Sequence, residues 1–387
     1  MEAESPAAGA SLAQWLGLAL TPGLGQRGLH NLFEHFSSAE EIYAASLTEL
    51  EGCGLAVGVA RQLHDGRALA LGAEEAGRAE RQGVEVVSRA DRRYPELLRE
   101  IFDAPVALYV RGDAAALDTF GVALVGTRHP TVYGKLMAEK LGRELAQWGL
   151  TVFSGMARGV DGDCQRACLE AGGRTVAVLG SGVDIIYPSE HEKLAEQIMA
   201  GTNGRRGALV SELPLGAPPA PQNFPIRNRI ISGMALGVVV IEGGEYSGSR
   251  ITARMALEQD REVFAVPGMA TQKQAWLPNA LIKQGAKLVT GAADVIEELP
   301  SAVRGRLDPP PVMAVTLAAA ATGEGAEPSL QAKILNVLAV DDTAQVDEIG
   351  NRMDNSLTAP ELLAALFDLE LEGKIRQLPG KKYLRVS

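Results

Sequence analysis

Residues 122–134 read VALVGTRHPTVYG, and residues 151–162 read TVFSGMARGVDG. In both stretches a short apolar run leads through a glycine-containing loop into a segment that begins a helical pattern. Strand–loop–helix units of this kind, repeated along a chain, are typical of a sheet whose strands pair in parallel. We therefore predict an α/β domain of the extended Rossmann-like type, with a doubly wound, mostly parallel sheet.

The same alternation continues on both sides of these stretches. Six apolar runs are expected to form strands, at residues 122–125, 151–153, 175–179, 208–211, 237–241 and 262–266. Amphipathic helices are expected between and after them, at residues 134–148, 162–171, 190–199, 225–234, 249–259 and 279–284. The α/β domain is therefore placed at residues 86–300, with a six-stranded core.

Residues 1–85 contain short helical segments and small-residue turns, without strand-like alternation. This pattern predicts a small all-α domain of the SAM or helix–hairpin–helix type. Glycines in the turns at 22–25 and 50–55 can expose backbone N–H groups to a phosphate. A helical packing domain without a ligand is the simpler interpretation, because several glutamates lie near these turns: Glu40, Glu41, Glu49 and Glu51.

Residues 301–329 are rich in Ala, Pro and Gly and are predicted to form a linker. Residues 330–387 then show helices at 330–338, 346–352 and 359–372, followed by a hairpin of 374–378 and 383–386, which predicts a winged-helix-like domain. Lys381 and Lys382 at the hairpin tip suit duplex DNA, but Glu361 and Asp368 on the preceding helix would repel phosphate. A protein contact or a spacer role is equally compatible with this domain.

The composition gives weaker constraints. The chain of 387 residues has a formal net charge of −11, which by itself disfavours nucleic acid as a partner. Much of the acidity lies in residues 1–109, with 16 acidic and 9 basic side chains, whereas residues 110–299 hold 20 and 19. The three cysteines, the absence of an uncharged apolar run of about 18 residues and the non-basic start together favour a cytoplasmic protein without a membrane segment.

Three successive strands end in loops that combine glycine with hydroxyl or guanidinium groups: Gly126, Thr127 and Arg128; Ser154, Gly155 and Arg158; Ser181 and Gly182. Ligands of a doubly wound sheet bind beyond the carboxyl ends of its strands, where helix N-termini point. Each loop alone is a weak signal, since such turns favour glycine for packing. Three in succession indicate an anionic ligand. Asp161, at the end of the second loop, is expected to cap the next helix.

Standard nucleotide motifs are incomplete in this chain. Ile185 stands where the dinucleotide fingerprint requires its third glycine, and Leu136 follows Gly134-Lys135 where a Walker loop places a magnesium-binding hydroxyl. We therefore expect neither NAD nor ATP as a cofactor. Cys164 and Cys168 share a helix face, but no further ligands with suitable spacing accompany them, so a metal site is not expected.

Residues 223–232 read NFPIRNRIIS and begin a predicted helix. Phe224, placed in a flexible loop, could stack on an unpaired base, and Arg227, Asn228 and Arg229 could contact phosphates. The alternative is that Phe224 is a packing staple and that the arginines are solvated or capping charges. The residues by themselves leave both interpretations open.

These segments, taken together, resemble the DprA/Smf family of DNA-processing proteins. The resemblance runs in order over about residues 90–300 and rests on the following stretches: 94–98, 126–128, 154–161, 177–182, 187–188, 224–231, 247–253, 265–268 and 281–286. The flanking helical and winged modules match longer members of the family.

The resemblance implies a homodimer, built through the α/β domain, that catalyses nothing. It further implies a protein that binds and protects incoming single-stranded DNA and helps to load the RecA recombinase in natural transformation. By this resemblance Arg128 would clamp a phosphate and Phe224 would stack or wedge at a base. Arg227 and Asn228 would shape the same pocket, while Ser181 and Gly182 would donate to DNA at the sheet edge.

The chain departs from the family pattern in three places, at Cys164-Gln165, at Arg250 and at Pro278. The competing hypothesis is an enzyme, a Rossmann-like nucleotide phosphoribohydrolase with glycine loops at the same strand ends. Residues 241–249, IEGGEYSGS, match its signature only in part, because the Gly-Thr and the following Glu are missing. Among the histidines, only His129 lies in a candidate loop, where we expect a DNA contact or a solvent-facing turn.

Overall fold

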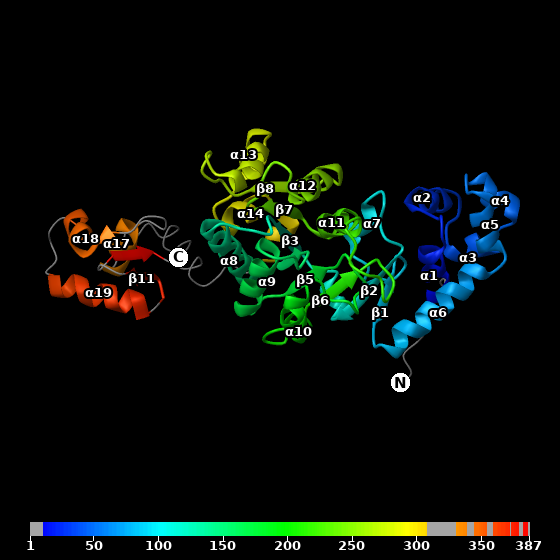
Figure 1. The fold of residues 1–387 in the computed structure, drawn as a ribbon, viewed down its shortest axis with the longest axis horizontal. Coiled ribbons are helices and arrows are strands. Elements are labelled where there is room, and N and C mark those ends of the chain that lie inside the picture. Colours follow the sequence, from blue (N-terminus) through cyan, green and yellow to red (C-terminus); the bar gives the residue numbers. More distant parts are fainter. Residues whose placement is uncertain are drawn as a thin grey trace. The chain divides into compact units, whose positions relative to one another are not determined.

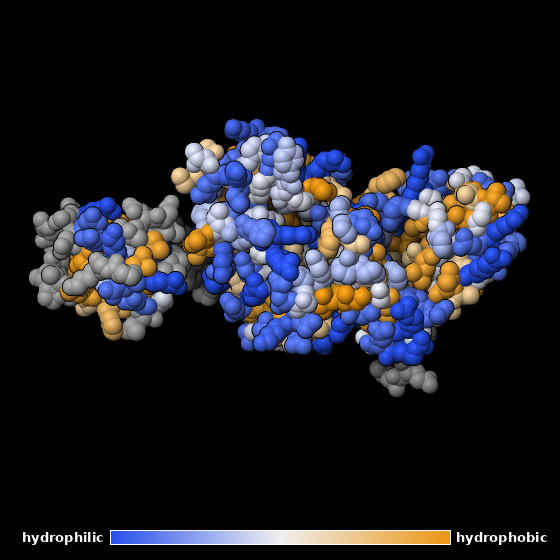
Figure 2. All heavy atoms as spheres, in the orientation of Figure 1, coloured by the Kyte–Doolittle hydropathy of each residue, from blue (hydrophilic) through white to orange (hydrophobic). Residues whose placement is uncertain are grey.

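The computed structural model describes residues 11–307, 330–338, 344–353, 359–371, 373–378 and 382–385. The chain divides into two compact units, Met1–Pro309 and Pro310–Ser387, each of which is described by itself (Figure 1). The face of the first unit seen in Figure 2 is mostly hydrophilic, with scattered apolar groups. Within the described residues, no helix has both the length and the apolar character that crossing a bilayer requires.

In the described part of the N-terminal region, the chain forms only helices up to residue 81: α1 (Leu12–Leu20), α2 (Gln26–His35), α3 (Ala39–Ala44), α4 (Leu47–Gly52), α5 (Val57–His64) and α6 (Arg67–Arg81). Ser11, Ser38 and Ser46 cap α1, α3 and α4 by accepting a backbone N–H of the first turn. Leu32 and Ile42 are fully buried in a core of this region's own. The all-α prediction is confirmed.

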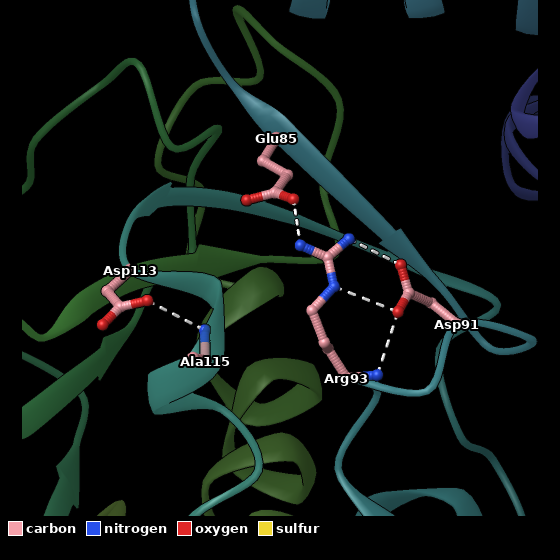
Figure 3. Close-up of polar contacts among 5 residues, drawn as sticks. All are labelled: Glu85, Asp91, Arg93, Asp113 and Ala115. Atoms are coloured by element: carbon pink, nitrogen blue, oxygen red, sulfur yellow. Dashed lines mark hydrogen bonds and ion pairs between the residues drawn. The ribbon is translucent and has the colours of Figure 1, made fainter. Parts of the chain in front are cut away.

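Helices α1 and α6 also pack on the edge of the sheet, so the helical region is not separate from the α/β part. Leu16 of α1 and Ala79 of α6 share a buried cluster with Ala107 and Tyr109. The boundary at residue 85 therefore stays a prediction. Next to this edge Arg93 forms an ion pair with Asp91 at 2.7 Å and another with Glu85, which holds the loop that follows the first strand (Figure 3).

Residues 11–307 contain a nine-stranded sheet in the order β1-β2-β6-β5-β4-β3-β7-β8-β9. Its strands are β1 (Glu85–Ser88), β2 (Ala107–Gly112), β3 (Gly121–Val125), β4 (Thr151–Ser154), β5 (Thr175–Val178), β6 (Ala208–Ser211), β7 (Gly237–Val240), β8 (Glu262–Ala265) and β9 (Lys287–Leu288). The strands from β6 to β9 pair in parallel, whereas β1 and β2 add antiparallel strands at one edge. The mostly parallel sheet is confirmed, with three strands more than predicted.

Helices cover both faces of this sheet, and the side chains of β3 alternate between them. Ala123 and Val125 face a core that includes residues of α7, α11, α12 and α13, whereas Val122 and Leu124 face a core that includes residues of α8, α9, α14 and α15. The helices of the α/β part are α7 (Glu96–Glu100), α8 (Val132–Gln147), α9 (Val160–Glu170), α10 (Glu192–Ala200), α11 (Asn223–Met234), α12 (Ser249–Glu258), α13 (Trp276–Lys283), α14 (Ala292–Glu298) and α15 (Ser301–Arg304).

The beginning of the predicted linker belongs to this packed unit. Helix α15 lies within residues 301–329, and its Val303 is buried in the core of the α8 face. Leu307 packs against the same core. Residues 308–329 lie outside the described part of the chain.

The C-terminal unit is a small helical module with its own sheet. Its described elements are α17 (Leu330–Val337), β10 (Ala344–Gln345), α18 (Val346–Arg352), α19 (Ala359–Leu371), β11 (Ile375–Leu378) and β12 (Lys382–Arg385). The strands pair in the order β10-β12-β11 around a core that includes Leu366 and Tyr383. The winged-helix prediction is confirmed, with β10 as an additional strand; the hairpin tip at 379–381 lies outside the described residues.

The order of the strands locates the point where a ligand is expected. From β3 the chain proceeds through β4 and β5 to β6 on one side, and then returns to place β7 on the other side of β3. The crevice beyond the carboxyl ends of β3 and β7 is therefore the topological switch point, where doubly wound folds bind ligands. Gly126, Thr127 and Arg128 lie there.

Candidate functional site

Two adjoining hollows lie at the switch point. The larger, which we name the switch groove, has a volume of about 380 Å³ and lies between the loop after β3, the start of α11 and the start of α12; its lining includes Gly126, Thr127, Arg128, His129, Asp161, Phe224, Arg227, Asn228, Ser247 and Ser249. The smaller, the side pocket, is lined by Arg128, Gly155, Ala157, Arg158, Gly180, Tyr187, Pro188, Phe224 and Arg227. Arg128, Ala157, Phe224 and Arg227 line both.

Phe224 lies where the two hollows meet and is half-buried. It is the second residue of α11, so the flexible loop expected from the sequence is wrong at this position. Its ring centroid lies 5.4 Å from the guanidinium carbon of Arg128 and 5.9 Å from that of Arg227, and the Tyr187 ring is 5.6 Å away. Two cations and two aromatic rings therefore lie close together.

A glycine makes room for this ring. A Cβ added at Gly180 would lie 2.8 Å from Cδ1 of Phe224, closer than two carbons can approach. The side-chain amide of Asn223 donates to the Gly180 carbonyl at 3.2 Å, which ties the start of α11 to the loop after β5. The loop glycine thus serves the placement of an aromatic side chain.

Arg227 is a buried cation that ties strand ends together. Its Nη1 donates to the carbonyl of Gly155 at 2.7 Å and also to that of Val178, so it bridges the ends of β4 and β5. Its Nε has no partner among the described residues. Burial lowers the pKa of Arg227 to about 10, and the charge of Asp161 opposes this shift. Arg227 stays protonated at neutral pH and shapes the pocket while adding positive charge.

Asp161 stabilises the loop between β4 and α9. Its Oδ2 accepts the Gly155 N–H at 3.1 Å, and its side chain is buried. Burial raises the pKa of this carboxyl, while the Arg227 charge and the hydrogen bonds lower it. The predicted N-cap role is wrong, because Gly159 occupies the N-cap of α9 and Asp161 lies in the first turn. The side chain turns back to the loop instead.

The exposed arginines of the side pocket differ in what they contact. Arg158 is held by Glu190 through two short contacts of 2.5 and 2.6 Å. Arg128 is exposed, and within the described part of the chain no carboxylate or carbonyl oxygen pairs with its guanidinium. Arg128 is therefore the side chain of the site that is best placed to take an anion from solution.

A carboxylate fills the position at the N-terminus of α8 where this fold would ordinarily accept a phosphate. Glu242, directly beyond β7, is 2% exposed and accepts the Thr131 N–H at 2.8 Å and the Thr131 hydroxyl at 2.6 Å. A Cβ at Gly134 would lie 2.2 Å from its Oε2. The N-terminus of α8 is therefore occupied by a side chain of the protein itself.

Four of the residues predicted to contact DNA do not line either hollow. The hydroxyls of Ser154 and Ser181 donate to the carbonyls of Leu124 and Ile185, both at 2.7 Å, and the Gly182 N–H donates to Ala217 at 2.9 Å. Arg229 is buried on another side of α11, where it pairs with Asp103 at 3.2 Å and with Glu212. The side chains of Arg227 and Arg229 point in different directions, because residues two positions apart in an α-helix are rotated by roughly 200° about its axis.

The remaining predicted residues are brought together: Gly126, Thr127, Arg128, Gly155, Arg158, Phe224, Arg227 and Asn228. Sequence reasoning quoted the stretches that contain Tyr187, Glu242 and the Ser247–Ser249 turn, but it assigned none of them to the DNA site; the two serine hydroxyls lie 2.7 Å apart. Position directly beyond β7 could have indicated Glu242. Pairing of Tyr187 with Phe224 leaves no trace in the sequence.

The departures from the family pattern do not occupy the site. Gln165 is fully buried, and its amide donates to the Thr175 hydroxyl at 3.0 Å. Pro278 lies in the first turn of α13, where its missing N–H costs no helical hydrogen bond. Arg250 is exposed and does not line either hollow. Cys164 and Cys168 are buried, as expected for small packing side chains.

The chain is similar to known proteins over both units. The family model for DNA recombination-mediator protein A matches residues 85–300, and that for the DprA winged helix domain matches residues 318–381. The chain is 40% identical over 294 residues to protein Smf of Escherichia coli strain K12, covering 74% of each chain. It is 43% identical over 220 residues to DNA processing protein DprA of Bacillus subtilis strain 168, covering 57% of this chain and 72% of that one.

The X-ray structure of DNA processing protein A from Streptococcus pneumoniae superposes with a TM-score of 0.66 at 31% identity. It covers 76% of this chain and 99% of that one. The matches include the sheet, the loops of the switch point and the winged-helix unit. The chain therefore belongs to the DprA/Smf family of DNA-processing proteins.

Proposed function

We propose that this protein binds single-stranded DNA across the switch groove and the side pocket, without catalysing a reaction on it. The observation that carries the proposal is the position of Arg128. Its guanidinium is exposed, pairs with no carboxylate in the described residues and lies 5.4 Å from the centroid of a half-buried phenylalanine. A phosphate-binding cation and a base-stacking surface are thus adjacent.

Charge supports a phosphate as the group that is bound. Arg128 can donate two parallel hydrogen bonds to phosphate oxygens, a geometry that suits a guanidinium. Arg227 lies beside it and is held in place by carbonyls, so its position does not depend on the ligand. The local positive charge can bind a polyanion although the whole chain is acidic.

The aromatic groups support an unpaired strand. Phe224 is half-buried and Tyr187 is 37% exposed, and their rings are tilted by 39° to one another. The faces of bases in a duplex are covered by their neighbours, whereas unpaired bases can stack on such side chains. Single-stranded DNA offers a phosphate to the cation and an unpaired base to the rings.

The carboxylates nearest the site support a binding protein over the competing hydrolase. Glu242 is buried and holds Thr131 through both of its oxygens. Asp161 is held by the Gly155 N–H and by the charge of Arg227. Neither carboxylate is placed to act as a base or nucleophile on a bound nucleotide. Sustained release of ribose 5-phosphate from a nucleotide, lost in Glu242→Gln, would overturn this part of the proposal.

We infer the wider role from family membership. The protein is proposed to protect incoming DNA and to help load the RecA recombinase in natural transformation, in the cytoplasm and as a homodimer. Exposed apolar side chains support self-association through the α/β part: Tyr246, Leu257, Met269 and Trp276. Sedimentation analysis of the full chain, with and without RecA, tests the dimer and the partner.

The test of DNA binding is a titration of a labelled oligothymidylate, read by fluorescence anisotropy at several salt concentrations. Arg128→Ala should weaken binding and reduce the slope of log Kobs against log[salt] by about 0.7, the share of one phosphate on a single strand. Phe224→Ala should weaken binding with the slope unchanged. Arg254→Ala is the control, because Arg254 is 76% exposed and lies outside both hollows. Wild-type affinity in both site variants, or equal affinity for duplex DNA, would contradict the proposal.

A further inference from the structure

A third hollow lies at the opposite end of the same sheet, beside the amino ends of β3, β4 and β5. We name it the amino-end pocket. It has a volume of about 260 Å³ and is lined by Thr119, Phe120, Gly149, Thr151, Arg174, Arg205, Arg306 and Leu307. Strand β3 is five residues long, so roughly 13 Å of strand separate this pocket from the switch point.

The amino-end pocket concentrates positive charge. Three of its lining residues are arginines and none is acidic. Within the described residues, no ion pair neutralises Arg174, Arg205 or Arg306. Asp118, which precedes Thr119, is exposed and does not line the pocket, and Asp308, which follows Leu307, lies outside the described residues. Three arginines without acidic partners repel one another, although the chain as a whole has a net charge of −11. An anion bound between them makes this arrangement of charges favourable.

The backbone holds these arginines at the pocket wall. Arg174 directly precedes β5, and its Nε donates to the carbonyl of Arg206 at 3.1 Å. The Arg205 N–H donates to the Thr202 carbonyl at 2.9 Å in the turn after α10. The N–H of Arg306 donates to the carbonyl of the buried Val303, also at 2.9 Å. The backbone atoms that carry the three guanidinium groups are therefore fixed in the folded unit.

An aromatic side chain adjoins the cations. Phe120 is 39% exposed, and the guanidinium carbon of Arg306 lies 5.6 Å from its ring centroid. Cations beside an accessible aromatic face are the combination with which proteins bind single strands, because the backbone is neutralised while a base stacks. A small phosphate alone would bind the cations without using the face of this ring.

We propose that the amino-end pocket binds a second segment of single-stranded nucleic acid, with phosphate between the three arginines and an unpaired base on Phe120. The pocket has its own cations and its own ring, so it does not depend on the switch groove. A strand that reaches both sites has to extend from one end of the sheet to the other. The second contact is therefore available only to long strands, or to a second strand.

The test compares two triple variants of the full chain that lose the same charge. Arg174→Ala, Arg205→Ala and Arg306→Ala together remove the pocket, whereas Arg27→Ala, Arg61→Ala and Arg92→Ala remove exposed arginines elsewhere. The pocket variant should bind a long oligothymidylate roughly tenfold more weakly, with the salt slope reduced by about 0.7, the share of the one phosphate held between the three arginines. The same binding curve for both triple variants would overturn the proposal.

Two further measurements separate the possible failures. Arg128→Ala tests the switch groove: if it alone leaves binding unchanged while the pocket variant loses it, the proposed function fails and the second site stands. If the pocket variant does not fold, the wild-type protein is cross-linked by light to an oligonucleotide containing bromouracil. Cross-links at the peptide of Phe120 support the proposal, and their absence there contradicts it. Displacement of the oligonucleotide by inorganic phosphate, beyond the effect of chloride at equal ionic strength, would instead indicate a small-anion site.

Discussion

Gly180→Ala perturbs the aromatic part of the site without removing any charge. The added methyl would lie 2.8 Å from Cδ1 and 3.0 Å from Cε1 of Phe224, so the ring has to move. The backbone at Gly180 does not require a positive φ, and alanine fits it without strain. Tyr187 and Arg128 limit where the ring can go, because both lie within 6 Å of its centroid.

The size of the effect follows from stacking. A base on an aromatic side chain contributes about 1–3 kcal/mol, and a tenfold change in affinity corresponds to about 1.4 kcal/mol. Gly180→Ala should therefore weaken binding of oligothymidylate by roughly 5- to 150-fold. The salt slope should stay at the wild-type value, because no phosphate contact is lost.

Fluorescence anisotropy over a salt series measures both quantities, and thermal unfolding confirms that the variant is folded. Gly58→Ala is the matched control, because a Cβ there meets nothing within 4 Å and the position needs no positive φ. Wild-type affinity in a folded Gly180→Ala protein would refute the role given to the Phe224 ring. A reduced salt slope would refute the separation of stacking from phosphate binding.

Three further outcomes test the interior of the fold. Glu242→Gln should lower the free energy of unfolding by about 1–3 kcal/mol, since it weakens the contacts to Thr131, and chemical denaturation measures this. Arg229→Ala should cost about 3–5 kcal/mol in the same assay, because it leaves Glu212 buried and unpaired, yet should not change the salt slope of DNA binding. Burial raises the pKa of Cys168 to about 12, so iodoacetamide should label it at neutral pH only after unfolding; rapid labelling of the native protein would contradict this burial.

The central strands could be predicted because each is an apolar run followed by a helix. The strands that were missed lack this signal. β9 has two residues, both exposed, and β1 and β2 form an antiparallel pair before the alternation begins. Their place in the sheet depends on pairing with strands far along the chain, such as β2 with β6, which no local pattern indicates.

The loops of the site were identified from glycine and charge, but the direction of each side chain was not. Ser154 and Ser181 fit a phosphate loop as residue types, yet both hydroxyls donate to backbone carbonyls inside the fold. Arg227 and Arg229 are equivalent in composition, and only the turn of α11 sends one to the site and the other to Asp103. Whether a polar side chain can contact a ligand therefore depends on its burial and on the side of the helix or loop from which it projects.

The position of Glu242 explains why side chains that are accessible to a ligand, such as Arg128, are important at this site. Its carboxylate comes from 111 residues beyond Thr131 and occupies the N-terminus of α8, where the fold would otherwise hold a phosphate with backbone N–H groups. At the DNA site that we propose, the ligand would therefore be held by side chains, above all by Arg128. Backbone N–H groups at a helix terminus would bind a mononucleotide phosphate in one orientation, whereas the exposed guanidinium beside Phe224 would contact a phosphate of a strand irrespective of its sequence. The buried carboxylate is thus consistent with the proposed binding of a strand and disfavours a mononucleotide at the N-terminus of α8.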